Sequence, residues 1–155
     1  MGLILYFNVA AVLVILDQVV KYWAATHLAL GQSAPLLPGF VELLRVHNDG
    51  AAWSSFSGMR WLLVAVTAAV MVFVASLIVR RIVRHPAGVF ACTLILAGGA
   101  GNLIDRIRLG YVVDLFHFQF MEFPVFNVAD ICVSCGAVLG LIYYLWFYDR
   151  DRARR

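Results

Sequence analysis

Apolar residues along the chain gather into four runs, each long enough to cross the hydrocarbon core of a bilayer. A membrane-spanning helix needs about 20 predominantly apolar residues. The runs that meet this requirement are residues 3–25, 61–79, 87–104 and 129–148. The second run carries no charged residue along its whole length. The pattern predicts a mainly α-helical integral membrane protein, a single membrane domain of residues 1–155 with four transmembrane helices.

Two polar segments, residues 26–60 and 105–128, separate these runs on one side of the expected membrane. The first segment contains four residues that interrupt helices: Gly31, Pro35, Pro38 and Gly39. Residues 40–47 are typical of one or two strands, and residues 48–50 of a turn. We therefore expect a small antiparallel sheet that lies on the membrane surface.

Composition supports lipid as the solvent for much of the surface. Apolar residues make up 63% of the chain and charged residues 14%, whereas a soluble domain averages about 45–50% and about 25%. A protein of 17.2 kDa cannot hide this excess in its core. The formal net charge is +3, but most basic residues flank apolar runs, so we expect a membrane partner and no nucleic acid.

The positions of the basic residues predict the orientation. Three lie in the turn between the second and third runs, and four lie in the C-terminal tail: Arg80, Arg81, Arg84, Arg150, Arg152, Arg154 and Arg155. Cytoplasmic loops carry an excess of Lys and Arg. Both termini are therefore expected in the cytoplasm, with segments 26–60 and 105–128 on the outer face.

Ionisable residues in or beside the runs gather at one depth. An ionisable side chain at the centre of a transmembrane helix costs about 2.5–3.5 kcal/mol on insertion scales. The residues concerned are Asp17, Lys21, Asp105, Arg106, Asp114 and Asp130. All of them fall toward the outer ends of the first, third and fourth runs. This common depth favours a shared site over side chains that reach separately for the membrane surface.

The first and third apolar runs each carry a cluster of polar residues near the outer end. Asp17 and Lys21 are four residues apart, which suits a helical ion pair; they either form a simple ion pair or belong to the site. Asn102, Asp105 and Arg106 share one face at the end of a glycine-rich helix, where the guanidinium can bind a carboxylate or a peptide carbonyl. The glycines themselves favour close helix packing.

Asp114 and Asp130 flank the same short outer connection. Asn127 and Asp130 also have the spacing of a helix cap, so Asp130 has a structural alternative. Two carboxylates that face each other can share one proton and activate a water. At about 4 Å and an effective dielectric of about 20 they repel by roughly 4 kcal/mol, or about three pKa units. One would then stay protonated near neutral pH.

Five motifs stand in order along the chain: residues 17–21 (DQVVK), 48–54 (NDGAAWS), 97–106 (AGGAGNLIDR), 112–114 (VVD) and 126–130 (FNVAD). Together they resemble the motifs of the bacterial lipoprotein signal peptidases, the signal peptidase II family, over nearly the whole chain. Ala97 stands where that family has Gly, and Trp53 stands where Phe is more usual. Both are mild departures, because each keeps the size class of the side chain.

The resemblance implies an aspartic endopeptidase of the bacterial plasma (inner) membrane, active near the outer face. It implies cleavage of prolipoproteins before the diacylglyceryl-modified cysteine, with membrane lipid as a further partner, no cofactor or metal, and a monomeric state. It implies four transmembrane helices, an outer β-cradle and an outer helical segment. The residues implied are the catalytic Asp114 and Asp130, the orienting or substrate-binding Asn48, Asn102, Arg106 and Asn127, and the supporting Asp17, Lys21 and Asp105.

Two other functions compete with this one. A transporter or proton-conducting protein would use Asp17, Asp105 and Asp130 as a relay, but these acids cluster at one end of the runs. A membrane thiol oxidoreductase would use Cys132 and Cys135, which have C-x-x-C spacing. Two small residues one helical turn apart give the same spacing, and no zinc-type partner accompanies them.

Overall fold

The computed structural model describes residues 2–51 and 55–148. Trp53 of the loop motif and the four arginines of the C-terminal tail lie outside these residues. The four helices are α1 (Gly2–His27), α2 (Arg60–Val79), α3 (Pro86–Arg108) and α4 (Val128–Trp146). All four are long and apolar enough to cross a membrane. The predicted fold class, four transmembrane helices with a small antiparallel sheet, is confirmed.

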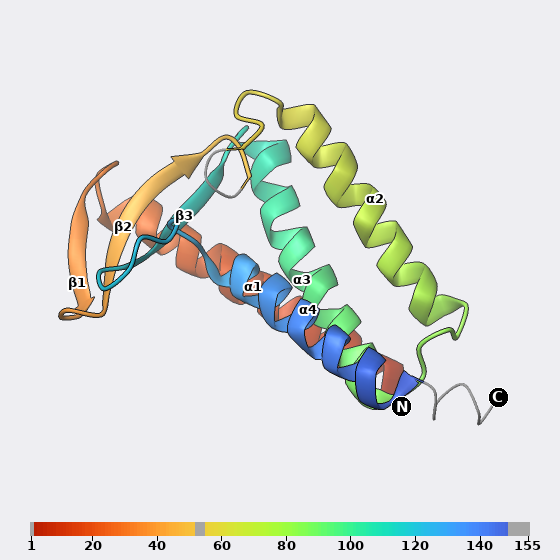
Figure 1. The fold of residues 1–155 in the computed structure, drawn as a ribbon. Helices are drawn as coiled ribbons and strands as arrows, with labels where there is room; N and C mark the ends of the chain where they lie inside the picture. The colour runs from red at the N-terminus through yellow and green to blue at the C-terminus, as the bar shows by residue number, and fades with distance from the viewer. Residues whose placement is uncertain (1, 52–54, 149–155) are drawn as a thin grey trace.

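The sheet has three strands, β1 (Ser33–Leu37), β2 (Val41–Asn48) and β3 (Val112–Phe118), in the order β1-β2-β3. Both pairs of strands are antiparallel. The sheet sits across one end of the helices, and α1 begins and α4 ends at the opposite end (Figure 1). The predicted strand at residues 40–47 corresponds to β2. Pro35 is accommodated in β1 because β1 is an edge strand, where a missing N–H need not face a partner.

Helix α3 is the central helix, since it packs against α1, α2 and α4. Its approach to α4 is close enough to require glycine at two levels. A Cβ on Gly98 would meet the carbonyl oxygen of Ala129, and a Cβ on Gly136 would lie 2.9 Å from the carbonyl oxygen of Ala91. These two contacts bring the α3 and α4 backbones together and fix the start of α4 beside the polar end of α3.

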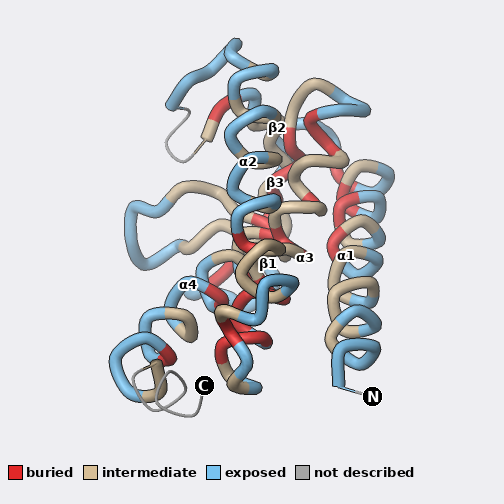
Figure 2. The backbone as a smooth tube through the Cα atoms, turned by 90° about the vertical axis from the view of Figure 1, so that its right-hand side faces the viewer, coloured by how far each residue is buried: buried red, intermediate tan, exposed pale blue. Residues whose placement is uncertain are grey.

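The outer surfaces of the helices are those of a protein in lipid. Within α2, Val74 is the only buried residue. Within α1, the buried residues are Asp17, Lys21 and Ala24, and the rest of the helix is exposed or half-buried (Figure 2). This helix therefore buries its charges and exposes most of its apolar side chains. A soluble protein shows the opposite distribution. The charges of α1 face protein, as expected for ionisable groups in a transmembrane helix.

Two details differ from the sequence-based expectations. Helix α3 continues to Arg108, four residues beyond the predicted end, because Asp105 and Arg106 are buried against protein and do not end the helix. The outer helical segment is not found among the described residues of segments 26–60 and 105–128. Apart from the ends of the four long helices, those residues form strands, turns and loops, with backbone groups paired across the sheet. Residues 52–54 lie outside the described part.

Candidate active site

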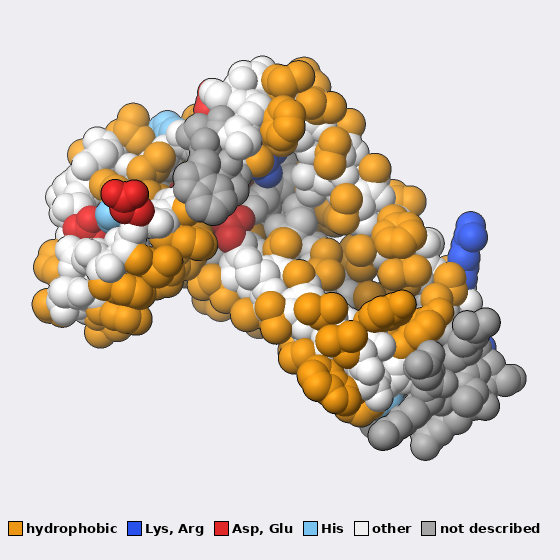
Figure 3. Space-filling view, in the orientation of Figure 1, with side chains coloured by type: hydrophobic (Ala, Val, Ile, Leu, Met, Phe, Trp, Pro, Cys, Tyr) orange, Lys and Arg blue, Asp and Glu red, His pale blue; other side chains and the backbone are white. Residues whose placement is uncertain are grey.

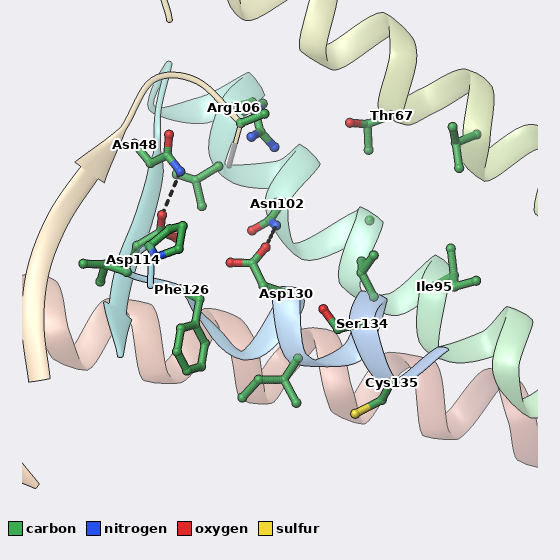
Figure 4. A pocket seen from close by; sticks show the side chains of 18 of the residues that line it. Asn48, Thr67, Ile95, Asn102, Arg106, Asp114, Phe126, Asp130, Ser134 and Cys135 are labelled. Carbon is green, nitrogen blue, oxygen red and sulfur yellow. Dashed lines mark hydrogen bonds between the residues drawn. The ribbon is translucent and has the colours of Figure 1, made fainter. Parts of the chain in front are cut away.

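A cavity of about 620 Å³ opens where the sheet meets the helices. Asn48 of β2 and Asp114 of β3 line it next to Asn102 and Arg106 of α3 and Asp130 of α4 (Figure 4). These residues are up to 82 positions apart in the chain and reach one cavity because β3 runs beside the sheet-side end of α3. We call this space the main cavity.

Asp114 lies in the middle of β3 and is 2% exposed. Its Oδ1 accepts a hydrogen bond from Nδ2 of Asn127 at 2.6 Å, and its Oδ2 accepts one from Nδ2 of Asn48 at 2.9 Å. Pairing between β2 and β3 sets this geometry, because it places Val112 opposite Asn48 and Asp114 opposite Val46. Both carboxylate oxygens of Asp114 are thus held by neutral amides.

Asp130 is in the first turn of α4. Asn127 caps this helix: its Oδ1 accepts from the Asp130 N–H at 2.9 Å, and Asp130 Oδ2 accepts from the Asn127 N–H at 3.1 Å. The other oxygen, Oδ1, accepts from Nδ2 of Asn102 at 2.7 Å. The capping alternative predicted for Asp130 is therefore correct, and the cap holds the carboxylate at the cavity wall.

Asn127 joins the two carboxylates. Its side-chain Nδ2 donates to Asp114, its backbone N–H donates to Asp130, and Nδ2 also lies 3.1 Å from Oδ1 of Asn102. Asn127 is fully buried, so these bonds form away from water and are sensitive to loss of either partner. The two carboxylates are therefore bridged by one asparagine and line the same cavity.

The environment of Asp114 favours its protonated form. Burial raises the pKa of Asp114 to about 7, and the nearby negative charge of Asp130 acts in the same direction. Hydrogen bonds from Asn48 and Asn127 oppose this shift but do not cancel it. Removal from water disfavours a charged carboxylate, and a second carboxylate close by disfavours it further. A proton is therefore retained at this site up to about neutral pH.

Behind the carboxylates lies a second group of buried polar residues, the Lys21 network, made of Asp17, Gln18, Lys21 and Asp105. Lys21 Nζ is 2.9 Å from Asp17 and 3.0 Å from Asp105. It also donates to Oδ1 of Asn102 at 2.9 Å. Because Asn102 also bonds Asp130, the ion pair predicted in the first run is connected to the main cavity. Asp17 and Lys21 thus form an ion pair and also belong to the site.

The two acids of the Lys21 network hold backbone groups next to the cavity carboxylates. Asp17 Oδ1 accepts from the N–H of Ala129 at 2.9 Å, and Asp105 Oδ2 accepts from the N–H of Val113 at 3.3 Å. Ala129 directly precedes Asp130, and Val113 directly precedes Asp114. The first of these bonds also satisfies an N–H in the first turn of α4, which has no partner within its own helix.

Arg106 and Gln18 complete the polar set. Arg106 is buried and donates from Nη2 to the carbonyl oxygen of Gly50 at 2.8 Å, which ties the turn after β2 to α3. Gln18 was part of a sequence motif but had no predicted role. Its Nε2 lies 3.0 Å from Asp105 and 3.2 Å from Asp17. Its role could have been predicted, because Gln18 is a polar residue between Asp17 and Lys21 in an otherwise apolar run.

Three other chemistries find less support in the described residues. No group of three or more His, Cys, Asp or Glu side chains is arranged there to hold a metal ion. Cys132 is buried and Cys135 is exposed, and both are free thiols. The ionisable residues of the described helices cluster at the sheet-side end, which gives no continuous relay across the membrane.

Four membrane-length helices, a surface sheet and a cavity with two adjoining carboxylates define an integral membrane enzyme. A family model described as Signal peptidase (SPase) II matches residues 9–147. The chain belongs to the signal peptidase II family and is a membrane aspartic peptidase, as the sequence motifs implied.

Relatives and solved structures agree with this assignment. The chain is 42% identical to the lipoprotein signal peptidase of Lactococcus lactis subsp. cremoris over 133 residues, 85% of this chain and 87% of the relative. It is 41% identical to that of Streptococcus pyogenes serotype M2 over 138 residues, 86% and 88% of the two chains. A solved bacterial membrane enzyme superposes with a TM-score of 0.87 at 32% identity, covering 90% of this chain and 87% of that one.

Proposed function

We propose that this protein removes the signal peptide of prolipoproteins by cleaving before the diacylglyceryl-modified cysteine. The aspartate pair, Asp114 and Asp130, would activate the attacking water. The observation that carries this proposal is the bridge through Asn127, which holds both carboxylates at one cavity wall. The relatives named above are lipoprotein signal peptidases, and the substrate is inferred for this chain from that likeness.

The chemistry requires one proton on the pair and one ionised carboxylate. The ionised carboxylate takes a proton from water as the water attacks the peptide carbonyl. The protonated carboxyl donates a hydrogen bond to the developing oxyanion and later helps to protonate the leaving amine. The raised pKa of Asp114 supplies the retained proton. The titration belongs to the pair, because the two groups interact.

The remaining polar residues support this chemistry in different ways. Asn48, Asn102 and Asn127 orient the carboxylates by the hydrogen bonds described above. Arg106 lines the main cavity, and a guanidinium N–H that is not bonded to Gly50 can donate to a substrate carbonyl. Asp17, Lys21 and Asp105 position the backbone on which the pair is carried.

The main cavity suits a substrate that is held in lipid. Beyond the carboxylates its lining becomes apolar, with Val66, Val70 and Met71 of α2 facing Ile95 of α3. Apolar side chains cover the helices, and acidic side chains appear in the hollow between the sheet and α2 (Figure 3). A diacylglyceryl group keeps the scissile bond near the membrane surface. We infer that the acyl chains enter the apolar part of the cavity from the bilayer.

We further propose that both termini face the cytoplasm and that the main cavity faces outward, in a bacterial plasma membrane. The turn that carries Arg80, Arg81 and Arg84 lies at the end of the helices away from the sheet (Figure 1). The positive-inside rule assigns that end to the cytoplasm. The other three spans pack against α3, which supports a single membrane domain, and we propose that this domain works as a monomer.

The substrate proposal is tested by removing the lipid from the substrate. A peptide with an unmodified cysteine should be cleaved with a kcat/KM at least about 100-fold lower than its diacylglyceryl counterpart. Each buried CH₂ contributes about 0.8 kcal/mol, so burial of about four methylenes already accounts for that factor. Cleavage is measured by mass spectrometry of the two products in the same detergent micelles.

A third peptide, acylated at its N-terminus and not at the cysteine, separates docking in the cavity from simple partitioning into the micelle. We expect this control to behave like the unmodified peptide. Equal kcat/KM for all three peptides would contradict the proposed substrate while leaving the aspartate pair untouched.

The pH dependence of the reaction follows from the raised pKa of Asp114. As pH rises through about 7, the pair loses its proton and with it the acid that the mechanism needs. We expect kcat/KM to fall on the alkaline side by about tenfold per pH unit, the dependence of a single proton. Initial rates with the lipidated peptide from pH 5 to 9 give the profile. A rate that stays flat to pH 9 would show that no such proton is used.

A further inference from the structure

A second cavity, of about 260 Å³, lies between α1 and α3 and shares no lining residue with the main cavity. Its walls come from α1, α3, β2 and the start of β3, and its floor includes Lys21 and Asp105. Tyr22 and Tyr111 stand at its sides, and both carry a hydroxyl that can donate a hydrogen bond. The proposed peptidase reaction makes no use of this space.

The charges around the second cavity favour an anion. Lys21 is matched by the carboxylates of Asp17 and Asp105, which leaves the network with one excess negative charge. Arg45 and Arg108 add two positive charges to the wall, so the surroundings carry a net charge of about +1. Arg45 donates to the carbonyl oxygens of Ala25 and Leu28 and to neighbouring His47, and none of these is a carboxylate.

Arg108 is the more available of the two guanidinium groups. It is exposed, and among the described residues it forms no ion pair and no hydrogen bond through its side chain. It follows Asp105 by three residues on the same helix, so it stands over the cavity whose floor that acid forms. Guanidinium groups bind phosphate oxygens through two parallel N–H donors.

The position of this cavity selects a lipid over a free anion. It lies at the sheet-side ends of α1 and α3, the depth at which the helices leave the hydrocarbon. Next to it, α1 presents Val19, Tyr22 and Trp23, whose side chains are 57%, 73% and 42% exposed. Leu109, at the cavity wall, is 47% exposed. Acyl chains can therefore run along α1 below a headgroup held in the cavity.

We propose that the second cavity binds the phosphate group of an anionic phospholipid, held by Arg108 and Arg45 with the tyrosine hydroxyls. The phosphate would sit above the Lys21 network, on the side of Asp105 away from Asn102 and the aspartate pair. The ligand differs in chemistry from the substrate, and no residue lines both cavities. The proposal therefore stands independently of the peptidase reaction.

The test uses the full-length protein, stripped of lipid in detergent and titrated with phosphatidylglycerol under native mass spectrometry. We expect Arg108→Gln to weaken phosphatidylglycerol binding about tenfold, the effect of losing one hydrogen bond to a charged group. Phosphatidylcholine with the same acyl chains should bind the wild type weakly. In a thermal melt, phosphatidylglycerol should stabilise the wild type more than Arg108→Gln.

Arg80→Gln is the matched control, because Arg80 is also exposed but lies at the other end of the helices. This variant should retain wild-type binding of phosphatidylglycerol. An equal loss in both variants, or equal binding of the two lipids by the wild type, would overturn the proposal. Inorganic phosphate is the third arm. If it displaces phosphatidylglycerol at equimolar concentration, the assignment to a lipid headgroup is wrong.

Discussion

Replacing either member of the aspartate pair, as Asp114→Asn or Asp130→Asn, should lower kcat by about 1,000-fold or more. Asparagine keeps the shape of the side chain but can neither accept the proton of the water nor return one. General acid–base catalysis is worth about 10²–10⁴-fold. Groups that act as a unit lose most of their effect when either is removed. Single-turnover cleavage of the lipidated peptide measures the rate of the chemical step itself, without product release.

The control for this experiment is Asp49→Asn. Asp49 is exposed and accepts a hydrogen bond from Ser57. It follows Asn48 in the sequence but does not line the main cavity. We expect its kcat to stay within about twofold of the wild-type value, because surface substitutions have small effects. Asp130→Asn also weakens a helix cap, so rates are referred to the folded fraction of each variant. A folded Asp114→Asn or Asp130→Asn protein with a kcat within tenfold of wild type would end the proposed mechanism.

Lys21→Met should destabilise the protein by about 3–5 kcal/mol, the cost of leaving a buried charge without its partner. Lys21 is 3% exposed and is matched by two carboxylates at 2.9 and 3.0 Å. Methionine fills a similar volume but leaves Asp17 and Asp105 facing each other in a buried space. Unfolding in a mixed-micelle denaturant series, with activity recorded in parallel, measures the change.

Two further variants separate charge from packing at this position. Adding Asp105→Asn to Lys21→Met removes one of the unmatched carboxylates, so we expect it to recover part of the lost stability. Arg80→Met makes the same change of charge at an exposed helix end and should cost less than about 0.5 kcal/mol. If Lys21→Met costs no more than Arg80→Met, the Lys21 network does not stabilise the site as described.

The sequence was most informative about residues that break a pattern. Asp17, Lys21 and Asp130 interrupt apolar runs, and this local contrast was enough to predict where they gather. The transmembrane helices were predicted from the apolar runs themselves, since a helix that crosses lipid needs a long apolar run. No tertiary information was needed for either prediction.

Strand β3 escaped prediction because its environment comes from the rest of the fold. Its first four residues are all buried, so the alternation that marks a half-buried strand is absent. It becomes a strand by pairing with β2, from which it is separated by α2 and α3. The hydrogen bonds from Ala129 to Asp17 and from Val113 to Asp105 could not be predicted either, since their backbone N–H donors have no sequence signature.

The bond between Asp17 and the backbone of Ala129 joins residues 112 positions apart, from the first helix and the last. Helix α4 enters the bilayer after the other three during synthesis. A nascent chain that has not inserted α4 therefore lacks Asp130, the cap formed by Asn127 and the hydrogen bond from Ala129 to Asp17 of α1. The proposed aspartate pair is therefore assembled only after α4 has been inserted.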